Sequence, residues 1–506
     1  MSFSFSSSDV SSLAVSDWKF SQIFGDKLPG EEVQNVDIIT AVQFDKSGNH
    51  LAVGDRGGRV VIFEKTDGKE ESLECTSREE FEKPDFAVSR HPKFRYKTEL
   101  QSHEPEFDYL KSIEIEEKIN EIRWCATPNG PLYILSTNDK TIKLWKVKEH
   151  KVKQVKKMDI SQPVSSENSL LAERSFINGQ SEYIANGHSL EWKENTVNGV
   201  SSFNGGHAKL ACLVDSTRAT CRKVYAHAHD FNTNSISINS DGETFISADD
   251  LRINLWNFEI SNQCFNIIDM KPENMEDLTE VITSAEFHPY HCNLMAYTSS
   301  RGFIRLVDMR LSALCDHSAK ILKDEESHGP KSFFTEIIAA ITDLKFANGG
   351  RHILCRDFMN LKLWDMRMDT CPVATYRIHE HLRPKLCDMY NNDAIFDKFE
   401  CCLAGDRLNF ATGSYSNHLR IFSYGIGSEE GTTIEVGKNP NRKLLLQSTP
   451  RLRRSSLSNL TRGFSRQGSN EFGFDFNSKL LHMAWNPTTN LIACAAGNTL
   501  LMYHHA

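Results

Sequence analysis

The sequence contains no long hydrophobic run. A membrane-spanning helix needs ~18 or more consecutive apolar residues, and no stretch of the chain reaches that length. The leading segment, MSFSFSSSDVSSLAVSDWKF, has neither the basic start nor the sustained apolar core of a secretory signal. We therefore expect no membrane span and no export signal.

Cysteine is present but follows no recognisable spacing. The 13 cysteines are scattered, with one adjacent pair at Cys401 and Cys402 and no C-x-x-C. This usage is typical of a reduced intracellular protein rather than a disulfide-linked secreted one. The expected location is the cytoplasm, with the nucleus as a second compartment.

Catalytic and nucleotide-binding signatures are also missing. The patterns G-x-G-x-x-G, H-E-x-x-H and G-x-S-x-G do not occur, and neither does a phosphate loop. Two histidine pairs, His227 with His229 and His379 with His381, could ligate a metal from one face of a strand. Turn or core histidines are the simpler interpretation, because no cysteine or carboxylate stands at zinc-ligand spacing. We predict no metal, no cofactor and no catalytic residues.

Positive charge is not in excess. The chain has 58 Lys and Arg against 67 Asp and Glu, a formal charge of −9 and a pI near 6.1. This balance argues against nucleic acid as the main partner and favours basic partners. Acid is densest from Glu99 to Glu121, where eight carboxylates stand against two lysines.

A repeat, partly hidden by insertions, runs through the whole chain. SADDLRINLW (247–256) has relatives such as STNDKTIKLW (136–145), and each ends an alternating apolar run. Each of the seven runs follows a shorter strand-like patch by 18 to 21 residues. The seven runs end at Phe63, Trp145, Trp256, Val307, Trp364, Phe422 and Tyr503. The seven patches end at Phe44, Trp124, Ile238, Phe287, Phe346, Cys402 and Trp485.

Three strands in about 20 residues, with a fourth in the connection, make one blade of a WD-type propeller. We predict an all-β fold: a single seven-bladed propeller over 18–506, preceded by a disordered tail at 1–17. The patch DWKFSQIFG (17–25) is a spare strand that could complete the last blade. Long insertions are expected at 64–110 (acidic), at 146–222 (a protruding arm after blade 2) and at 425–470 (Ser/Arg-rich and flexible).

Five segments of the chain are long and non-repetitive: LQSHEPEFDYLKSIEIEEKIN (100–120), SADDLRINLW (247–256), LTEVITSAEFHP (278–289), SFFTEII (332–338) and NDAIFDKFECC (392–402). They closely resemble the 55 kDa regulatory B subunits of protein phosphatase 2A. The resemblance implies a non-catalytic propeller that docks on a HEAT-repeat scaffold, the A subunit, and contacts the catalytic C subunit. It further implies an arm, starting near Lys146, that grips the scaffold, and an acidic groove that selects phosphoserine and phosphothreonine substrates.

The resemblance also implies which residues bind substrate. They are Arg56, Asp249, Asp250, Leu251, Leu278, Val281, Tyr390, Phe396 and Lys398. Ordinary loop packing is the alternative interpretation for each.

The repeat pattern and the family resemblance predict different roles for the adjacent aspartates Asp249 and Asp250. Asp250 stands six residues before Trp256, as Asp139 does before Trp145, where WD repeats often place a turn aspartate. Repeat logic therefore predicts that Asp250 is structural and that Asp249 is free to function. The resemblance assigns substrate recognition to both.

Two further hypotheses concern regulation and an alternative function. RLRRSSLSNLTRGFSRQGS (451–469) places basic residues before Ser456, a pattern that basophilic kinases favour, so we predict a phosphosite; a solvated linker is the alternative. LVDMR (306–310) and LWDMR (363–367) resemble the W-D-x-R ending of propellers that act as substrate receptors of cullin ubiquitin ligases. A propeller enzyme is a further alternative.

Overall fold

The computed structural model describes residues 18–25, 34–66, 92–126, 131–157, 209–315, 318–324, 332–405, 409–424, 431–437 and 476–505. For 149–157 and 209–217 only the backbone is described. The predicted tail at 1–17, Ser456 and most of the Ser/Arg-rich loop lie outside these residues. Strands dominate the described chain, and none of its helices is long and apolar enough to cross a membrane.

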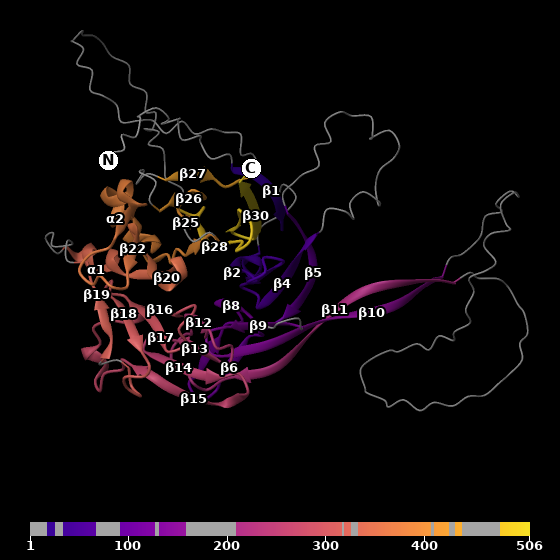
Figure 1. The fold of residues 1–506 in the computed structure, drawn as a ribbon, viewed down its shortest axis with the longest axis horizontal. Helices are drawn as coiled ribbons and strands as arrows, with labels where there is room; N and C mark the ends of the chain where they lie inside the picture. Colours follow the sequence, from indigo (N-terminus) through magenta and orange to yellow (C-terminus); the bar gives the residue numbers. More distant parts are fainter. Residues whose placement is uncertain are drawn as a thin grey trace, which may run out of the picture. The chain divides into compact units, whose positions relative to one another are not determined.

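The strands form seven four-stranded antiparallel sheets, the blades, which follow one another around a ring (Figure 1). Blade 1 holds β2 (Ile39–Phe44), β3 (His50–Asp55), β4 (Arg59–Thr66) and β5 (Lys93–Gln101). Blade 2 holds β8 (Glu121–Cys125), β9 (Leu132–Thr137), β10 (Ile142–Lys157) and β11 (Lys209–Tyr225). Blade 3 holds β12 (Ser235–Ile238), β13 (Thr244–Ala248), β14 (Arg252–Asn257) and β15 (Ile260–Asp269).

Blades 4 to 7 repeat this order. Blade 4 holds β16 (Ile282–Phe287), β17 (Leu294–Ser299), β18 (Ile304–Asp308) and β19 (Lys320–Leu322). Blade 5 holds β20 (Ile341–Ala347), β21 (His352–Asp357), β22 (Asn360–Asp365) and β23 (Ala374–Arg377). Blade 6 holds β24 (Cys401–Leu403), β25 (Asn409–Gly413), β26 (His418–Ser423) and β27 (Thr432–Glu435). Blade 7 holds β28 (Leu480–Trp485), β29 (Leu491–Ala496), β30 (Thr499–His505) and β1 (Trp18–Phe24).

The ring closes through its first and last strands, as the sequence predicts. The innermost strands contact one another in the order β2, β8, β12, β16, β20, β24 and β28, and β28 contacts β2 again. The spare amino-terminal strand β1 pairs with β30, from Trp18 opposite His505 to Phe24 opposite Leu500. The predicted seven-bladed, all-β propeller is therefore confirmed.

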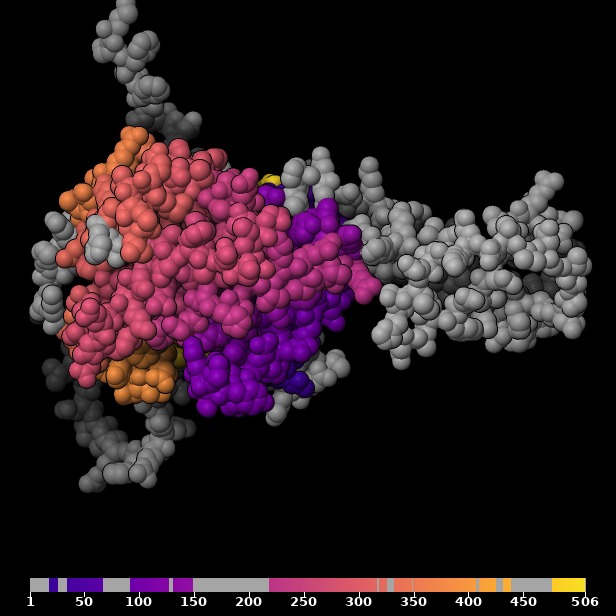
Figure 2. All heavy atoms as spheres, turned by 90° about the horizontal axis from the view of Figure 1, so that it is seen from below, coloured from indigo at the N-terminus to yellow at the C-terminus, as the bar shows by residue number. Residues whose placement is uncertain are grey.

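Apolar side chains from neighbouring blades form the core. One cluster joins Phe44 and Phe63 of blade 1 with Leu491 and Met502 of blade 7. Equivalent clusters join blades 3 and 4 and blades 4 and 5. Figure 2 shows the outer edge of the ring, where blades 3 and 4, coloured magenta to pink, lie side by side. The alternating runs of the sequence thus supply one apolar layer to each seam between blades.

Strands β10 and β11 cross the boundary between two compact units of the chain. The chain divides into one compact unit of residues 1–148 with 218–506 and a second unit of residues 149–217. Pairing of β10 with β9 stops at Val147, yet β10 and β11 are 16 and 17 residues long. Both strands therefore extend beyond the residues that pair with β9, and the protruding arm at 146–222 stays a prediction.

The innermost strand of each blade is an edge strand, and in blades 2 to 6 a side chain of the preceding blade accepts from an amide of that strand. Glu121 of blade 2 accepts from the Ile236 amide of blade 3 at 2.5 Å. Asp343 of blade 5 accepts from the Cys401 amide of blade 6 at 2.9 Å. The same arrangement links Gln43 to Trp124, Ser235 to Ala285, Ser237 to Phe287 and Glu286 to Phe346. These bonds connect five of the seams along the inside of the ring.

Opposite charges support this inner network. Lys345 Nζ lies 3.1 Å from Asp343 Oδ1, and Arg123 forms an ion pair with Glu121. Burial raises the pKa of Glu286, and the cations Lys345 and Arg123 only partly oppose that rise. The acceptors therefore depend on the cations between them.

Replacing Asp343 with Ala should destabilise the ring. The carboxylate is 5% exposed and accepts from the amides of Cys401 and Leu344, so its removal leaves two buried donors unsatisfied. We expect a loss of about 1–3 kcal/mol in the free energy of unfolding, measured by urea titration. Asp369→Ala, at a carboxylate that is 56% exposed, is the control. Equal midpoints for both variants would contradict a role for the inner network.

Candidate functional site

All the predicted site residues lie at one end of the ring. Arg56 and the stretch Asp249–Leu251 lie in turns between the second and third strands of blades 1 and 3. Leu278 and Val281 precede blade 4, and the remaining residues, Tyr390, Phe396 and Lys398, precede blade 6. In an antiparallel blade, these two kinds of connection meet at the same end of the sheet. We call this end the recognition face.

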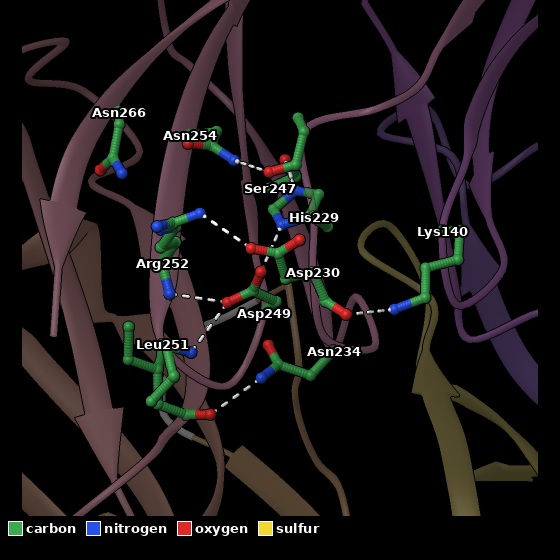
Figure 3. Close-up of polar contacts among 12 residues, drawn as sticks. Lys140, His229, Asp230, Asn234, Ser247, Asp249, Leu251, Arg252, Asn254 and Asn266 are labelled. Atoms are coloured by element: carbon green, nitrogen blue, oxygen red, sulfur yellow. Dashed lines mark hydrogen bonds and ion pairs between the residues drawn. The ribbon is translucent and has the colours of Figure 1, made fainter. Parts of the chain in front are cut away.

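Asp249 is part of a buried network beneath this face. Its side chain is fully buried, and Oδ1 accepts from the amides of Leu251 at 2.8 Å and Arg252 at 2.6 Å. Its Oδ2 lies 2.9 Å from Nδ1 of His229, whose Nε2 lies 2.6 Å from the Ser247 hydroxyl (Figure 3). Trp256 Nε1 donates to the same hydroxyl at 2.8 Å. The network fixes the turn between β13 and β14 to the body of blade 3.

The structural aspartate is therefore Asp249, and the assignment from repeat logic was wrong. Two other blades use the residue at the same position, seven before the tryptophan, in the same way. Asn138 Oδ1 accepts from the amides of Lys140 and Thr141, and Asp357 Oδ1 accepts from those of Met359 and Asn360. The signal was present in the sequence, but Asn138 conceals it, because an asparagine side chain closes such a turn as well as an aspartate does.

Burial also corrects the direct-contact role predicted for two residues. Asp249 and Leu251 are 0% and 1% exposed, so neither has a surface on which a bound segment could lie. The half-buried Asp250 between them does reach the recognition face. Its backbone carbonyl accepts from the Ile282 amide at 2.7 Å, which ties the turn to β16.

Asp250 interacts electrostatically with groups from two other blades. Burial raises its pKa; Lys398, which precedes blade 6, opposes the rise, and so do Asn234 and Lys140. Lys398 also acts on Lys118, whose pKa is lowered by burial and further lowered by Arg56 and Lys398, against the effect of Asp139. The predicted residues Arg56, Asp250 and Lys398 thus share one electrostatic environment on the recognition face.

An exposed aromatic cluster adjoins these charges. The Tyr390 and Phe396 rings are 39% and 53% exposed, with centroids 5.9 Å apart. Phe333, in α1 (Phe333–Ala339), is 65% exposed and lies 5.4 Å from Tyr390, the latter in α2 (Leu386–Asn391). Phe333 lies in the resembling segment SFFTEII, but no sequence pattern assigned it to the site. Leu278 and Val281 are half-buried at the edge of blade 4.

A small acidic hairpin stands on the same end of the ring. It consists of β6 (Glu106–Asp108) and β7 (Ile113–Ile115), and its tip residues Tyr109 and Leu110 are 85% and 98% exposed. Asp230 anchors it to blade 3, because this carboxylate contacts both Lys111 at 3.1 Å and Arg252 at 3.2 Å. A pocket of about 360 Å³ beside the hairpin is lined by Pro105, Glu106, Phe107, Glu114, Ile115, Glu116 and Glu117.

The histidine pairs do not assemble a metal site. His229 belongs to the Asp249 network, and His379 is fully buried with Nδ1 2.7 Å from the Phe358 carbonyl. Burial holds the pKa of His379 well below its ordinary value. Within the part of the chain that the structure describes, no group of three or more metal-ligating side chains exists.

Substitution of the two aspartates should separate their roles. Asp249→Asn keeps the shape but weakens the bonds to His229 and two amides, so we expect a lower melting temperature and a loss of about 1–3 kcal/mol. Asp250→Asn, the matched control, should leave the melting temperature unchanged or slightly higher, because burial disfavours its charged form. The opposite order of melting temperatures would return the structural role to Asp250.

The stabilising effect of Asp249 should depend on pH. Burial raises the pKa of this carboxyl, but the bonds from His229, Leu251 and Arg252 more than offset it, so the folded pKa lies below the ordinary 3.8. Its contribution is therefore complete above that value and is lost as pH falls through the folded pKa. The stability difference between wild type and Asp249→Asn should shrink below a pH of about 3.8. A difference that is constant down to about pH 2.5 would argue against the depressed pKa.

Comparison with known proteins agrees with the propeller architecture. The family described as "WD domain, G-beta repeat" matches residues 219–257, which include β13 and β14 of blade 3. Among solved structures, Raptor from Chaetomium thermophilum is similar at a TM-score of 0.47 and 12% identity, covering 97% of this chain and 30% of that one. That likeness is too distant to bear on fold or function.

Curated relatives are far more similar. A beta isoform of the 55 kDa regulatory B subunit of serine/threonine protein phosphatase 2A, from Arabidopsis thaliana, is 58% identical over 96% of this chain and 97% of that protein. An alpha isoform from Oryza sativa subsp. japonica is 57% identical over 96% and 85%, and the PP2A regulatory B subunit of Schizosaccharomyces pombe is 43% identical over 97% and 98%. These names support a regulatory, non-catalytic role. With such identity over nearly its whole length, the chain belongs to the family of 55 kDa regulatory B subunits of protein phosphatase 2A.

Proposed function

We propose that the chain is the substrate-selecting B subunit of a protein phosphatase 2A heterotrimer. In this role it binds the HEAT-repeat scaffold and the catalytic partner, the A and C subunits, and selects phosphoserine and phosphothreonine proteins through the recognition face. Relatives are named regulatory subunits of this phosphatase, which supports the general role. The proposal of substrate selection rests on one observation. Asp250, Lys398 and the Tyr390–Phe396 pair lie on the same face of the propeller.

The proposed mechanism requires no chemistry from this chain. A substrate segment held on the recognition face keeps its phosphorylated residue near the catalytic subunit, so that a bimolecular encounter becomes intramolecular. Such tethering raises avidity by roughly 10²–10⁴ without changing the chemical step. Exposed aromatic rings supply apolar contact area, and carboxylates such as Asp250 supply attraction for basic side chains.

Two parts of the chain are candidates for subunit contacts. The hairpin formed by β10 and β11 is the proposed scaffold-binding arm, because it continues beyond its blade. The apolar tip of the acidic hairpin is a candidate contact for the catalytic subunit, since Tyr109 and Leu110 are almost fully solvent-exposed and have no role in the propeller core. Large exposed apolar side chains on a rigid support are typical of docking sites.

The competing cullin-receptor function is less well supported. Arg310, in one of the two segments that suggested it, is engaged by Asp308 at the end of its own strand, with a closest approach of 2.6 Å. Affinity capture from the source cells separates the two functions, because the proposed function requires recovery of scaffold and catalytic subunits, whereas the alternative requires a cullin adaptor.

The proposed location is the cytoplasm, with the nucleus as a second site. Phosphorylation of Ser456 is proposed to regulate assembly or location.

Asp250→Asn should selectively impair protein substrates. In a reconstituted heterotrimer we expect kcat/KM for a phosphoprotein that depends on the recognition face to fall about tenfold, because one charge-assisted contact of about 1.4 kcal/mol is lost. The rate on a short phosphopeptide that lacks the docking segment should stay the same. If both rates fall together, or if neither falls, Asp250 does not select substrate.

Binding of a basic phosphoprotein should weaken as salt rises. Glu106 and Glu114 of the acidic hairpin are solvent-exposed, so their attraction for cationic segments is screened over about 8–10 Å at physiological ionic strength. We expect Kd to rise steadily from about 50 to 300 mM NaCl in a fluorescence anisotropy titration. A constant Kd over this range would remove electrostatic attraction from the mechanism.

A further inference from the structure

An open pocket adjoins the aromatic pair of the recognition face. Its volume is about 560 Å³, and it is lined by Asn392, Asp393, Ala394, Asp397, Phe476, Asn477 and Lys479. Ala394 and Asp397 flank the exposed Phe396, because all three belong to the short 3-10 helix Ala394–Phe396 (η6) and its cap. A side chain from any segment bound against Phe396 therefore has this pocket within reach.

A buried network gives the pocket a fixed wall. Tyr415, fully buried, donates from its hydroxyl to the Ala394 carbonyl at 2.5 Å and lies 3.0 Å from Asp397 Oδ2. Lys479 Nζ contacts Asp397 Oδ1 at 2.5 Å, so this carboxylate is neutralised by another residue that lines the pocket. The Tyr415 ring also packs edge-on against Phe476, with centroids 5.5 Å apart. Both walls are thus held to the same tyrosine.

Asp393 is the pocket's uncompensated charge. The residue is exposed, and it forms no ion pair with any other described residue. Its backbone adopts the left-handed conformation with φ of 56°, and its carbonyl accepts from the Phe396 amide. Aspartate and asparagine tolerate this conformation better than most residues. With Asp397 neutralised by Lys479, the pocket carries a net charge close to −1.

We propose that this pocket is a subsite for an arginine side chain of the substrate's docking segment, with Asp393 as the carboxylate that receives the guanidinium. The inference rests on the proposed function and deepens it, since it specifies one side chain of the segment that the recognition face binds. Nothing in the family resemblance assigns Asp393 a role.

The lining favours arginine over lysine. A guanidinium presents a planar pair of N–H groups to a carboxylate and stacks on aromatic rings, whereas an ammonium is a compact and strongly hydrated charge. The pocket offers the Asp393 carboxylate to a guanidinium, and Phe476, whose ring packs edge-on against Tyr415, is a further lining residue. The amide side chain of Asn392 adds a further polar group at the wall.

The test uses the assembled heterotrimer and synthetic phosphothreonine peptides that carry a docking segment. The docking segment is otherwise uncharged, and each peptide in the series carries one arginine at a different position. Each peptide is compared with a counterpart in which citrulline replaces the arginine. At one position, wild type should show a KM about tenfold lower for the arginine peptide than for the citrulline peptide, because of a single charge-assisted contact. Asp393→Asn, which suits the same backbone conformation, should reduce this ratio to about one with kcat unchanged.

Asp388→Asn is the matched control, because Asp388 is an exposed carboxylate on neighbouring α2 that does not line the pocket. It should retain the arginine preference. Charge exchange gives an independent readout: Asp393→Arg should prefer a glutamate peptide at the same register. A wild type without any arginine preference, or a preference that Asp393→Asn retains, overturns the subsite.

Failure of the subsite is distinguishable from failure of the proposed function. If Asp250→Asn weakens docking-dependent peptides and Asp393→Asn does not, only the subsite is wrong. If wild type shows no advantage for any peptide with a docking segment over a bare phosphopeptide, the substrate-selecting function itself fails, and the subsite with it.

Discussion

The propeller depends on how it satisfies the free edges of its innermost strands. Each blade begins with an edge strand, and a buried amide without a partner costs more than most single interactions contribute. The chain meets this constraint with side chains rather than with further strands: Glu121, Glu286 and Asp343 accept from amides of the next blade. Apolar packing between blades adds stabilisation, but these bonds also set the register of one blade against the next.

Much of the architecture could be predicted because it repeats. The seven short patches and the seven alternating runs, at nearly constant spacing, mark the first and third strands of the blades. The structure has these strands as pairs in every blade, from β2 with β4 in blade 1 to β28 with β30 in blade 7. The spare strand at Trp18–Phe24 was predicted for the same reason, since seven runs left one outer strand missing. The repeated spacing predicts the strands because every blade packs its apolar strands against the neighbouring blades in the same way.

The site was less predictable because it depends on which of two adjacent side chains points inward. Asp249 and Asp250 have the same chemistry, and the residue equivalent to Asp249 in blade 2 is the asparagine Asn138. A search for repeated aspartates therefore missed the position, and the buried partner His229 lies in another connection, where no local pattern reveals it. Phe333 was missed for a similar reason: its contact with Tyr390 joins connections from different blades, which only the closed ring brings together.

The pairing of β1 with β30 has a consequence for how the molecule is made. Residues Trp18–Phe24 precede all the other strands of the propeller in the chain, whereas their partners, within Thr499–His505, follow blades 1 to 6. During translation Trp18–Phe24 therefore stay unpaired, with their amides and aromatic side chains unprotected, until β30 has been made. Contacts of such long sequence separation form slowly, and exposed strands in the interval favour aggregation. The last blade is therefore complete only when the two strands of greatest sequence separation have met.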